Sequence, residues 1–208
     1  EINDRSPSIA ATLPTVERVN TQKWKTFGVP RGNRYAAVVN VARENIACDA
    51  VFEAASLPPG MTMNAARIPK SVTSFPVVFE AAPNAPDGSG LHAFHIRSEG
   101  TPAPLTGKLV DTINHIDINN QGAYHSASFD RIAAGVTMDA PFKVDLDTPP
   151  VPIVKNGTLN LKVRVARQPG YAEKITVRFL WSPPGISGPT NIDIPGDKSE
   201  GDYELHAS

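Results

Sequence analysis

The chain has one cysteine in 208 residues, Cys48, which excludes an internal disulfide. No run of about 18 apolar residues is present, so no transmembrane helix is predicted. Twenty prolines and fifteen glycines interrupt almost every stretch with helical spacing of apolar residues, which excludes long helices. The formal net charge is −1 with acids and bases intermixed, so the sequence offers no basic stripe. Nucleic acid and membrane are therefore not expected as partners.

What the sequence does contain is an internal repeat. Three anchors recur in the same order: residues 29–43 with 153–167, both ending in Val-Ala-Arg; the Pro-Pro-Gly of 58–60 with that of 183–185; and the Ile-Pro of 68–69 with that of 194–195. Self-similarity at a long period indicates tandem copies of one domain. Nothing after Ser208 corresponds to residues 83–144.

Alternation of apolar residues with a period of two predicts strands in both copies. The paired predictions are 35–41 with 159–165, 50–56 with 175–181, and 75–81 with 201–207. Each Pro-Pro-Gly predicts a type II turn, since proline fixes the first φ and glycine accepts the second. Further strands are predicted in the first copy alone, at 91–97 and 132–137. Cys48 precedes a strand, where a small half-buried side chain is expected.

Short alternating strands between Pro/Gly turns predict an all-β fold of two tandem antiparallel immunoglobulin-like β-sandwich modules. Module 1 is assigned to residues 1–144, with a long excursion over 98–130. Module 2 is assigned to residues 145–208 and lacks its last strands. The open edge of module 2 leads us to expect a fragment of a longer chain, or another chain that completes the sheet.

The densest collection of oxygen and imidazole groups lies in residues 111–130. Asp117, Asn119 and Gln121 alternate as at the start of a calcium-binding loop. The twelfth position, however, is Ser128, where such a loop has a bidentate glutamate. A polar hairpin tip is the alternative interpretation. We therefore expect no cofactor, with calcium as the only candidate ion.

Three further side chains are candidate binding residues. His115 and His125 lie in the same segment, but two imidazoles are too few for a zinc site. Trp24 lies between two lysines and is the candidate for a surface aromatic that stacks on carbohydrate. No Gly-x-Ser-x-Gly elbow is present, and a narrow sandwich rarely provides the cleft that paired catalytic carboxylates need. No catalytic residue is assigned, and the chain is not expected to be an enzyme.

The run APFKVDLDTPPVPIVKNGTLNLKVRVAR, the turn WSPPGISG and the entry IDIPGDKSEGDYEL resemble the repeated Ig-like modules of large exported proteins of planctomycete-type bacteria. Such modules are often found near pre-peptidase C-terminal domains. The resemblance covers nearly the whole chain and rests on turns and core positions. It implies an extracytoplasmic location (secreted, periplasmic or cell surface) and a non-catalytic structural or adhesive role. The alternative is a carbohydrate- or protein-binding module accessory to an extracellular enzyme. In both cases the expected partners are other protein chains or domains, with carbohydrate as a further candidate.

Overall fold

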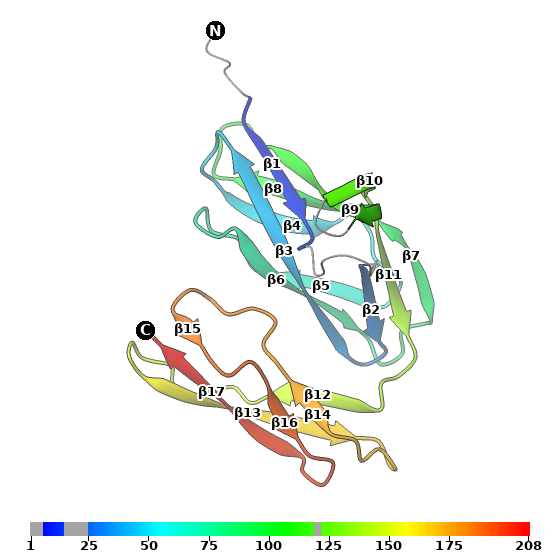
Figure 1. Cartoon of the computed structure of the whole chain (residues 1–208), viewed down its shortest axis with the longest axis vertical. Coiled ribbons are helices and arrows are strands. Elements are labelled where there is room, and N and C mark those ends of the chain that lie inside the picture. The colour runs from blue at the N-terminus through cyan, green and yellow to red at the C-terminus, as the bar shows by residue number, and fades with distance from the viewer. Residues whose placement is uncertain (1–5, 15–24, 119–121) are drawn as a thin grey trace. The chain divides into compact units, whose positions relative to one another are not determined.

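The computed structural model describes residues 6–14, 25–118 and 122–208, and these residues form strands and no helix (Figure 1). Side chains are described for all of them except 114–118 and 122–124. The chain divides into two compact units, Glu1–Met138 and Asp139–Ser208.

The first unit contains β1 (Ser8–Thr12), β2 (Thr26–Pro30), β3 (Arg34–Glu44), β4 (Asp49–Ala54), β5 (Met61–Ala65), β6 (Ser74–Ala81), β7 (Gly88–His92), β8 (Phe94–Glu99), β9 (Thr106–Ile118), β10 (Gly122–Phe129) and β11 (Ile132–Thr137). The second unit contains β12 (Phe142–Leu146), β13 (Thr158–Arg167), β14 (Ile175–Val177), β15 (Ile186–Ser187), β16 (Ile192–Ile194) and β17 (Glu200–Ala207). The module boundary expected near residue 144 falls inside β12, which pairs with β13 as an edge strand of the second unit.

The first unit is a β-sandwich. One layer has the order β1-β3-β6-β5, and the other combines β4, β8 and β9 with β2, β11 and β7. The short pairing of β1 with β9 joins the two layers. In an immunoglobulin domain the first, second, fifth and fourth strands form one sheet, and the third, sixth and seventh form the other. Here β1, β3, β6 and β5 are the first set, and β4, β7/β8 and β9/β11 are the second. The fold class predicted from the sequence is confirmed.

The sandwich is not antiparallel throughout, which differs from the prediction. β1 pairs with β9 in parallel, and β2 pairs with β11 in parallel. The reason is that the N-terminal strand crosses from one layer to the other and runs beside the last strand in the same direction. Within the excursion expected over 98–130, β9 and β10 form a hairpin. The strand predicted at 91–97 is divided at Ala93 into β7 and β8, which pair with different neighbours.

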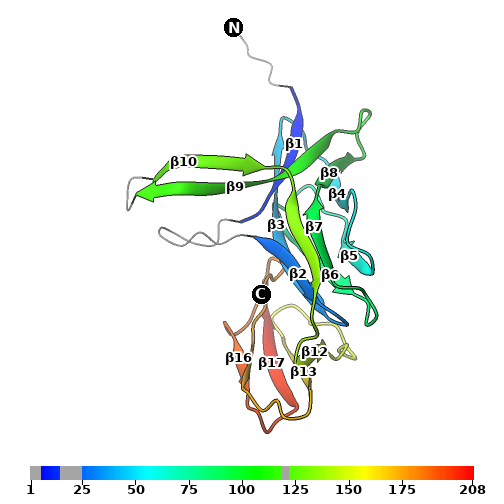
Figure 2. The ribbon, with the colours of Figure 1, turned by 90° about the vertical axis from the view of Figure 1, so that its right-hand side faces the viewer.

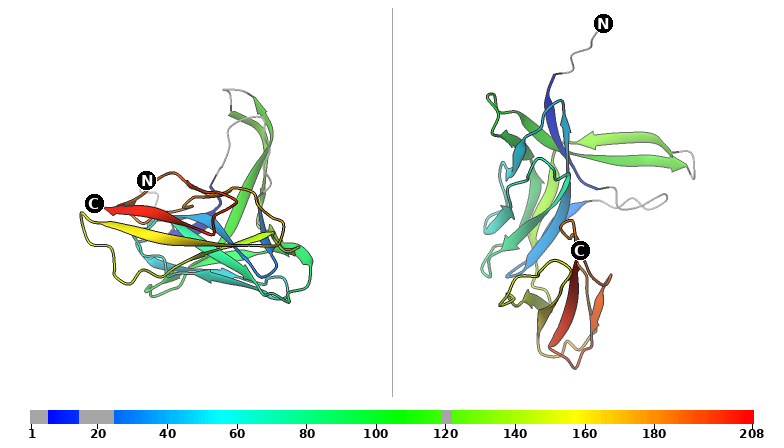
Figure 3. Two further views of the ribbon diagram at one scale, coloured as in Figure 1. Left: turned by 90° about the horizontal axis from the view of Figure 1, so that it is seen from below. Right: turned by 90° about the vertical axis from the view of Figure 1, so that its left-hand side faces the viewer.

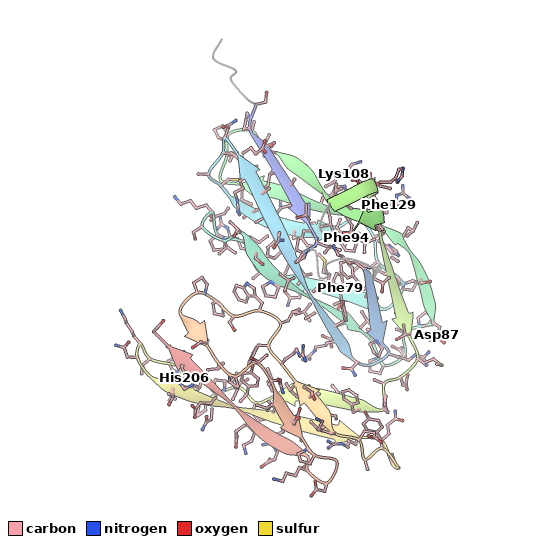
Figure 4. All side chains as sticks on the ribbon, in the orientation of Figure 1. Phe79, Asp87, Phe94, Lys108, Phe129 and His206 are labelled. Atoms are coloured by element: carbon pink, nitrogen blue, oxygen red, sulfur yellow. The ribbon has the colours of Figure 1, made fainter. Side chains whose placement is uncertain are left out.

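Aromatic side chains from both layers fill the core of the first unit. Phe79 stacks on Phe27 with ring centroids 4.5 Å apart and meets Phe94 edge-on at 6.0 Å. Phe94 in turn stacks on Phe52 at 5.8 Å. Phe79 and Phe94 are labelled in Figure 4. Each such buried ring contributes about 1.5–3 kcal/mol relative to exposure. Cys48 is 4% exposed, so it is a core residue, more buried than expected.

The second unit is smaller. One layer has the order β12-β13-β17-β15, and β14 pairs with β16 alone. Its fully buried core consists of Val163, Val165, Ile175, Ile194 and Tyr203. The strand predicted over 175–181 ends at Val177. Within residues 139–208, all of which are described, no strand lies beside β14 in the place that β8 takes beside β4, so residues 178–181 have no ladder to join.

Candidate functional site

The arginine that ends Val-Ala-Arg in the first unit binds the loop that follows β5. From its guanidinium, Arg43 donates hydrogen bonds to the carbonyl oxygens of Val72 at 2.7 Å, Pro69 at 3.3 Å and Ile68 at 3.5 Å. The planar guanidinium presents several donors in a fixed fork, so one side chain can hold three backbone carbonyls. We call this arrangement the arginine clamp.

The second unit has the same arginine clamp. Arg167 donates to the carbonyl oxygens of Pro195 at 3.0 Å, Ile194 at 3.3 Å and Lys198. The arginine and the Ile-Pro therefore recur together because one binds the other. This contact was not predicted from the sequence, although the joint recurrence of the two motifs is a signal that indicates it.

The Pro-Pro-Gly turns also match in geometry. The Met61 N–H donates to the Pro58 carbonyl at 3.0 Å, and the equivalent bond in the second unit is 3.1 Å. Gly60 and Gly185 have φ of 77° and 85°, as the third residue of a type II turn requires. A Cβ on Gly60 would lie 2.6 Å from the Cβ of Ala85, whereas at Gly185 the nearest atom is 3.5 Å away. The turns predicted from sequence are present in both units.

The turns before β3 and β13 repeat the pattern once more. Each is closed by a backbone hydrogen bond across four residues, of 3.0 Å and 2.9 Å. Gly32 and Asn156 occupy the same place with φ of 68° and 59°. Glycine and asparagine are the residues that tolerate this left-handed conformation best. The repeated motifs that the structure describes therefore stabilise the same arrangement of turns and strands in both units, which we call the repeated frame.

The clearest departure from that frame is the β9–β10 hairpin, which projects from the sandwich of the first unit (Figures 2 and 3). The first residues of β9 pair with β8, at His95↔Lys108, and the last strand then resumes as β11, where Ile132 pairs with His92 of β7. The hairpin is thus an insertion within the seventh strand of the sandwich. Its register runs from Phe129↔Asp111 outward, with irregularities beside His125.

A buried ion pair lies at the root of the hairpin. The Lys25 ammonium donates to Asp111 Oδ1 at 2.8 Å and to the carbonyl of Leu13 at 3.3 Å. The side chains of Lys25 and Asp111 are only 19% and 6% exposed. Asp111 is the first residue beyond the sandwich part of β9, and Leu13 and Lys25 flank residues 15–24. The ion pair therefore fixes the place where the hairpin leaves the sandwich.

Exposed polar contacts continue from the root along the hairpin. The Lys108 ammonium lies 2.7 Å from Asp130 Oδ2, and both side chains are exposed (Lys108 is labelled in Figure 4). The hydrogen bond from Lys108, together with its charge, holds the pKa of Asp130 below its usual value. The hydroxyls of Thr112 and Ser128 lie 3.0 Å apart across the two strands. Ser128, the twelfth position of the calcium-like pattern, is thus part of a cross-strand hydrogen bond.

The structure places the predicted site residues only in part. His125 lies in β10 with an exposed side chain, and His115 and Asp117 belong to β9 by their backbone. Outside the described residues lie Trp24, Asn119 and Gln121. The calcium and carbohydrate candidates therefore stay predictions. In the part of the chain that is described, no three His, Cys, Asp or Glu side chains gather as a metal site, and no helix could span a membrane.

Comparisons with known proteins assign no family. Scans against protein families and curated proteins found no match. Among solved structures, domains 4–9 of the surface layer protein SbsC match with 10% identity over 94% of this chain (TM-score 0.35). A protein of Porphyromonas gingivalis W83 matches with 9% identity, 97% of this chain, 83% of that chain and a TM-score of 0.30. The titin domains z1z2 in complex with telethonin match with 10% identity, 98% of this chain, 83% of that chain and a TM-score of 0.25. This chain spans 27% of the SbsC chain. Values this low assign no activity or partner.

Proposed function

We propose that the chain is a non-catalytic structural or adhesive array of β-sandwich modules within an exported, surface-associated bacterial protein. The observation that carries this proposal is the repeated frame. The arginine clamp and the Pro-Pro-Gly turn are present in both units, where the clamp holds a loop through one side chain and the turn is closed by a backbone hydrogen bond. The resemblance of these motifs to exported Ig-like modules supports the proposed extracytoplasmic location.

Protease treatment of intact cells tests the location. In the organism that encodes this chain, externally added protease should release peptides from residues 1–208, while a cytoplasmic marker protein stays intact. Release of these peptides only after lysis would contradict export. The structural role is tested separately, by pulling the purified chain between two marker domains. A module that spaces other domains should resist force until a discrete unfolding event, and gradual extension without such an event would contradict the role.

The alternative is a module that binds protein or carbohydrate as an accessory to an extracellular enzyme, and the β9–β10 hairpin favours it. Segments that project from a rigid sandwich commonly carry recognition, since the scaffold fixes their position. The buried Lys25–Asp111 ion pair provides such a fixed root. Glycan arrays and protein capture should compare the chain with a variant in which residues 113–127 are replaced by Asn-Gly. Equal binding by both would contradict a role for the hairpin, and His125→Ala serves as a milder probe of its exposed side.

A further inference from the structure

The parallel pairing of β2 with β11 lies on the path by which tension crosses the first unit. The two strands pair over five positions, which end at Pro30↔Thr137. One further hydrogen bond extends this ladder beyond β2, since the Arg31 N–H donates to the Thr137 carbonyl at 3.1 Å. β11 ends at Thr137, and the second unit begins at Asp139. A pull on the second unit therefore reaches the first unit through the C-terminal end of β11.

The direction of the two strands decides how the ladder is loaded. β2 and β11 run the same way along the first unit (Figure 2). Tension along the chain pulls the N-terminal end of β2 and the C-terminal end of β11, which are opposite ends of a parallel ladder. The hydrogen bonds of the ladder are then loaded together, in shear. In an antiparallel pair the same tension would act at one end and break the bonds one after another.

β1 is the strand that tension reaches first from the N-terminal side. It pairs with β3 over five positions and with β9 over two. β11 is held on both edges, by β2 and by β7, over five positions each. β1 should therefore be released before β11, because fewer pairs hold it. Once β1 is released, the load passes through Lys25 straight into β2 and across the ladder to β11.

A buried ion pair anchors the end of β2 at which this load enters. Lys25 immediately precedes β2, and its ammonium lies 2.8 Å from Asp111 Oδ1 of β9. The two side chains are largely shielded from solvent, so the attraction between their charges is screened less than at the surface. The ladder is shielded on its inner face as well, where Phe27 and Val29 of β2 and Val136 of β11 are buried. Water is thus poorly placed to replace either set of contacts under load.

We propose that the β2–β11 ladder is the load-bearing element of the first unit and that the Lys25–Asp111 ion pair anchors it. The proposal rests on the proposed structural role, and it names the strands and contacts that resist extension. It makes the resistance of the unit directional. The force needed is high when the two strands are pulled past one another along their length, and low when they are separated from one end.

Two attachment points at opposite ends of β11 test the direction of loading. The full chain is held at its N-terminus and at one introduced cysteine, either Met138→Cys after β11 or Arg131→Cys before it. Both side chains are exposed, whereas the native Cys48 is buried and does not compete for the attachment. Pulling through position 138 loads the ladder in shear, and pulling through position 131 peels it. We expect peeling to need about half the force or less, because single hydrogen bonds then break in turn.

The length of chain released identifies the barrier. In the pull through position 138, release of β1 should come first. The main event should then free residues 26–137, at about 3.3–3.6 Å of extended chain per residue. A main event that frees residues 8–137 in one step would put the barrier in β1 and overturn the proposal. Equal forces through positions 131 and 138 would also overturn it.

Two substitutions at Arg31 isolate one hydrogen bond of the ladder. Arg31→Pro removes the N–H that donates to Thr137, together with the side chain that pairs with Asp87. Arg31→Ala removes only the side chain and is the matched control. Proline suits this position because Arg31 is the second residue of a turn whose third residue, Gly32, has φ of 68°. Under constant force through position 138, Arg31→Pro should unfold about two- to tenfold faster than Arg31→Ala. Equal rates would count against the ladder as the barrier and overturn the proposal.

Lys25→Met combined with Asp111→Leu tests the anchor. Replacing both partners of a buried pair by apolar residues is often close to neutral at equilibrium, so the melting temperature should change little. The rate of unfolding under force through position 138 should nevertheless rise by about tenfold, because the directional contacts of Lys25 are lost. An unchanged rate would refute the anchoring role of the ion pair. Gradual extension without a discrete event would contradict the structural role as well, whereas a discrete event that none of these changes alters would contradict this proposal alone.

Discussion

Loss of the arginine clamp should affect the two units very differently. Arg43→Ala and Arg167→Ala each remove the donors that hold three backbone carbonyls. A hydrogen bond from a charged group contributes about 1.5–3 kcal/mol, and three that share one guanidinium do not add fully, so we expect about 3 kcal/mol for each unit. At about 2–4 °C per kcal/mol in a unit of this length, the melting temperature of the first unit should fall by about 6–12 °C.

The second unit should lose a larger share of its stability. Stability of about 0.05–0.15 kcal/mol per residue gives a unit of this size about 3.5–10 kcal/mol, and its small buried core places it near the lower end. Arg167→Ala should therefore leave the second unit with about 1 kcal/mol or less, so that a measurable fraction is unfolded at room temperature. Hydrogen exchange with mass spectrometry on the full chain would follow peptides from each unit separately, and urea titration would give the free energies of unfolding.

Lysine tests whether the fork geometry matters. A lysine ammonium carries its donors on a single nitrogen and lacks the planar fork of the guanidinium, so Arg43→Lys and Arg167→Lys should recover less than half of the loss. Arg34→Ala is the control, since Arg34 is exposed and pairs with Glu80 at the surface, where removal should cost under about 1 kcal/mol. A loss below about 0.5 kcal/mol in both alanine variants, or full recovery by lysine, would refute the structural role of the clamp.

Three further predictions concern the ion pairs and turns. Asp111→Asn leaves a buried ammonium without its counter-charge and should cost the first unit about 3 kcal/mol, measured by urea titration; a loss no larger than that of a surface variant would contradict a buried pair. Gly60→Ala should destabilise its unit more than Gly185→Ala does. Both variants place an alanine at a positive φ, which costs about 1 kcal/mol, but only the alanine at position 60 also meets a close contact. Equal shifts in melting temperature would count against this prediction. The hydrogen bond from Lys174 lowers the pKa of Asp193 below its ordinary value of 3.8, so the pair stabilises the second unit above a pH of about 4 and this contribution is lost as the pH falls further. Asp193→Asn should remove that part of the acid sensitivity in a pH series of thermal unfolding, and an unchanged pH profile would disprove it.

The sequence located residues 111–130 as the part of the chain richest in polar ligands, and the β9–β10 hairpin lies there. It did not show that the hairpin interrupts the last strand of the sandwich, because that depends on which strands pair with β7 and β8. It also did not pair Lys25 with Asp111, which lie 86 positions apart. No local pattern of residue types encodes a contact at that separation.

The sequence by itself determined the all-β class, the repeat and the Pro-Pro-Gly turns, because side-chain alternation and turn geometry depend on residues close together in the chain. Tertiary structure alone decided the parallel pairings of β1 and β2, the arginine clamps and the shortening of the strand at 175–181. Each of these requires a partner distant in sequence. A strand in particular extends only as far as a neighbour supplies its hydrogen bonds: β4 pairs with β8 over Asp49–Ala54, and β14 pairs with β16 over Ile175–Val177.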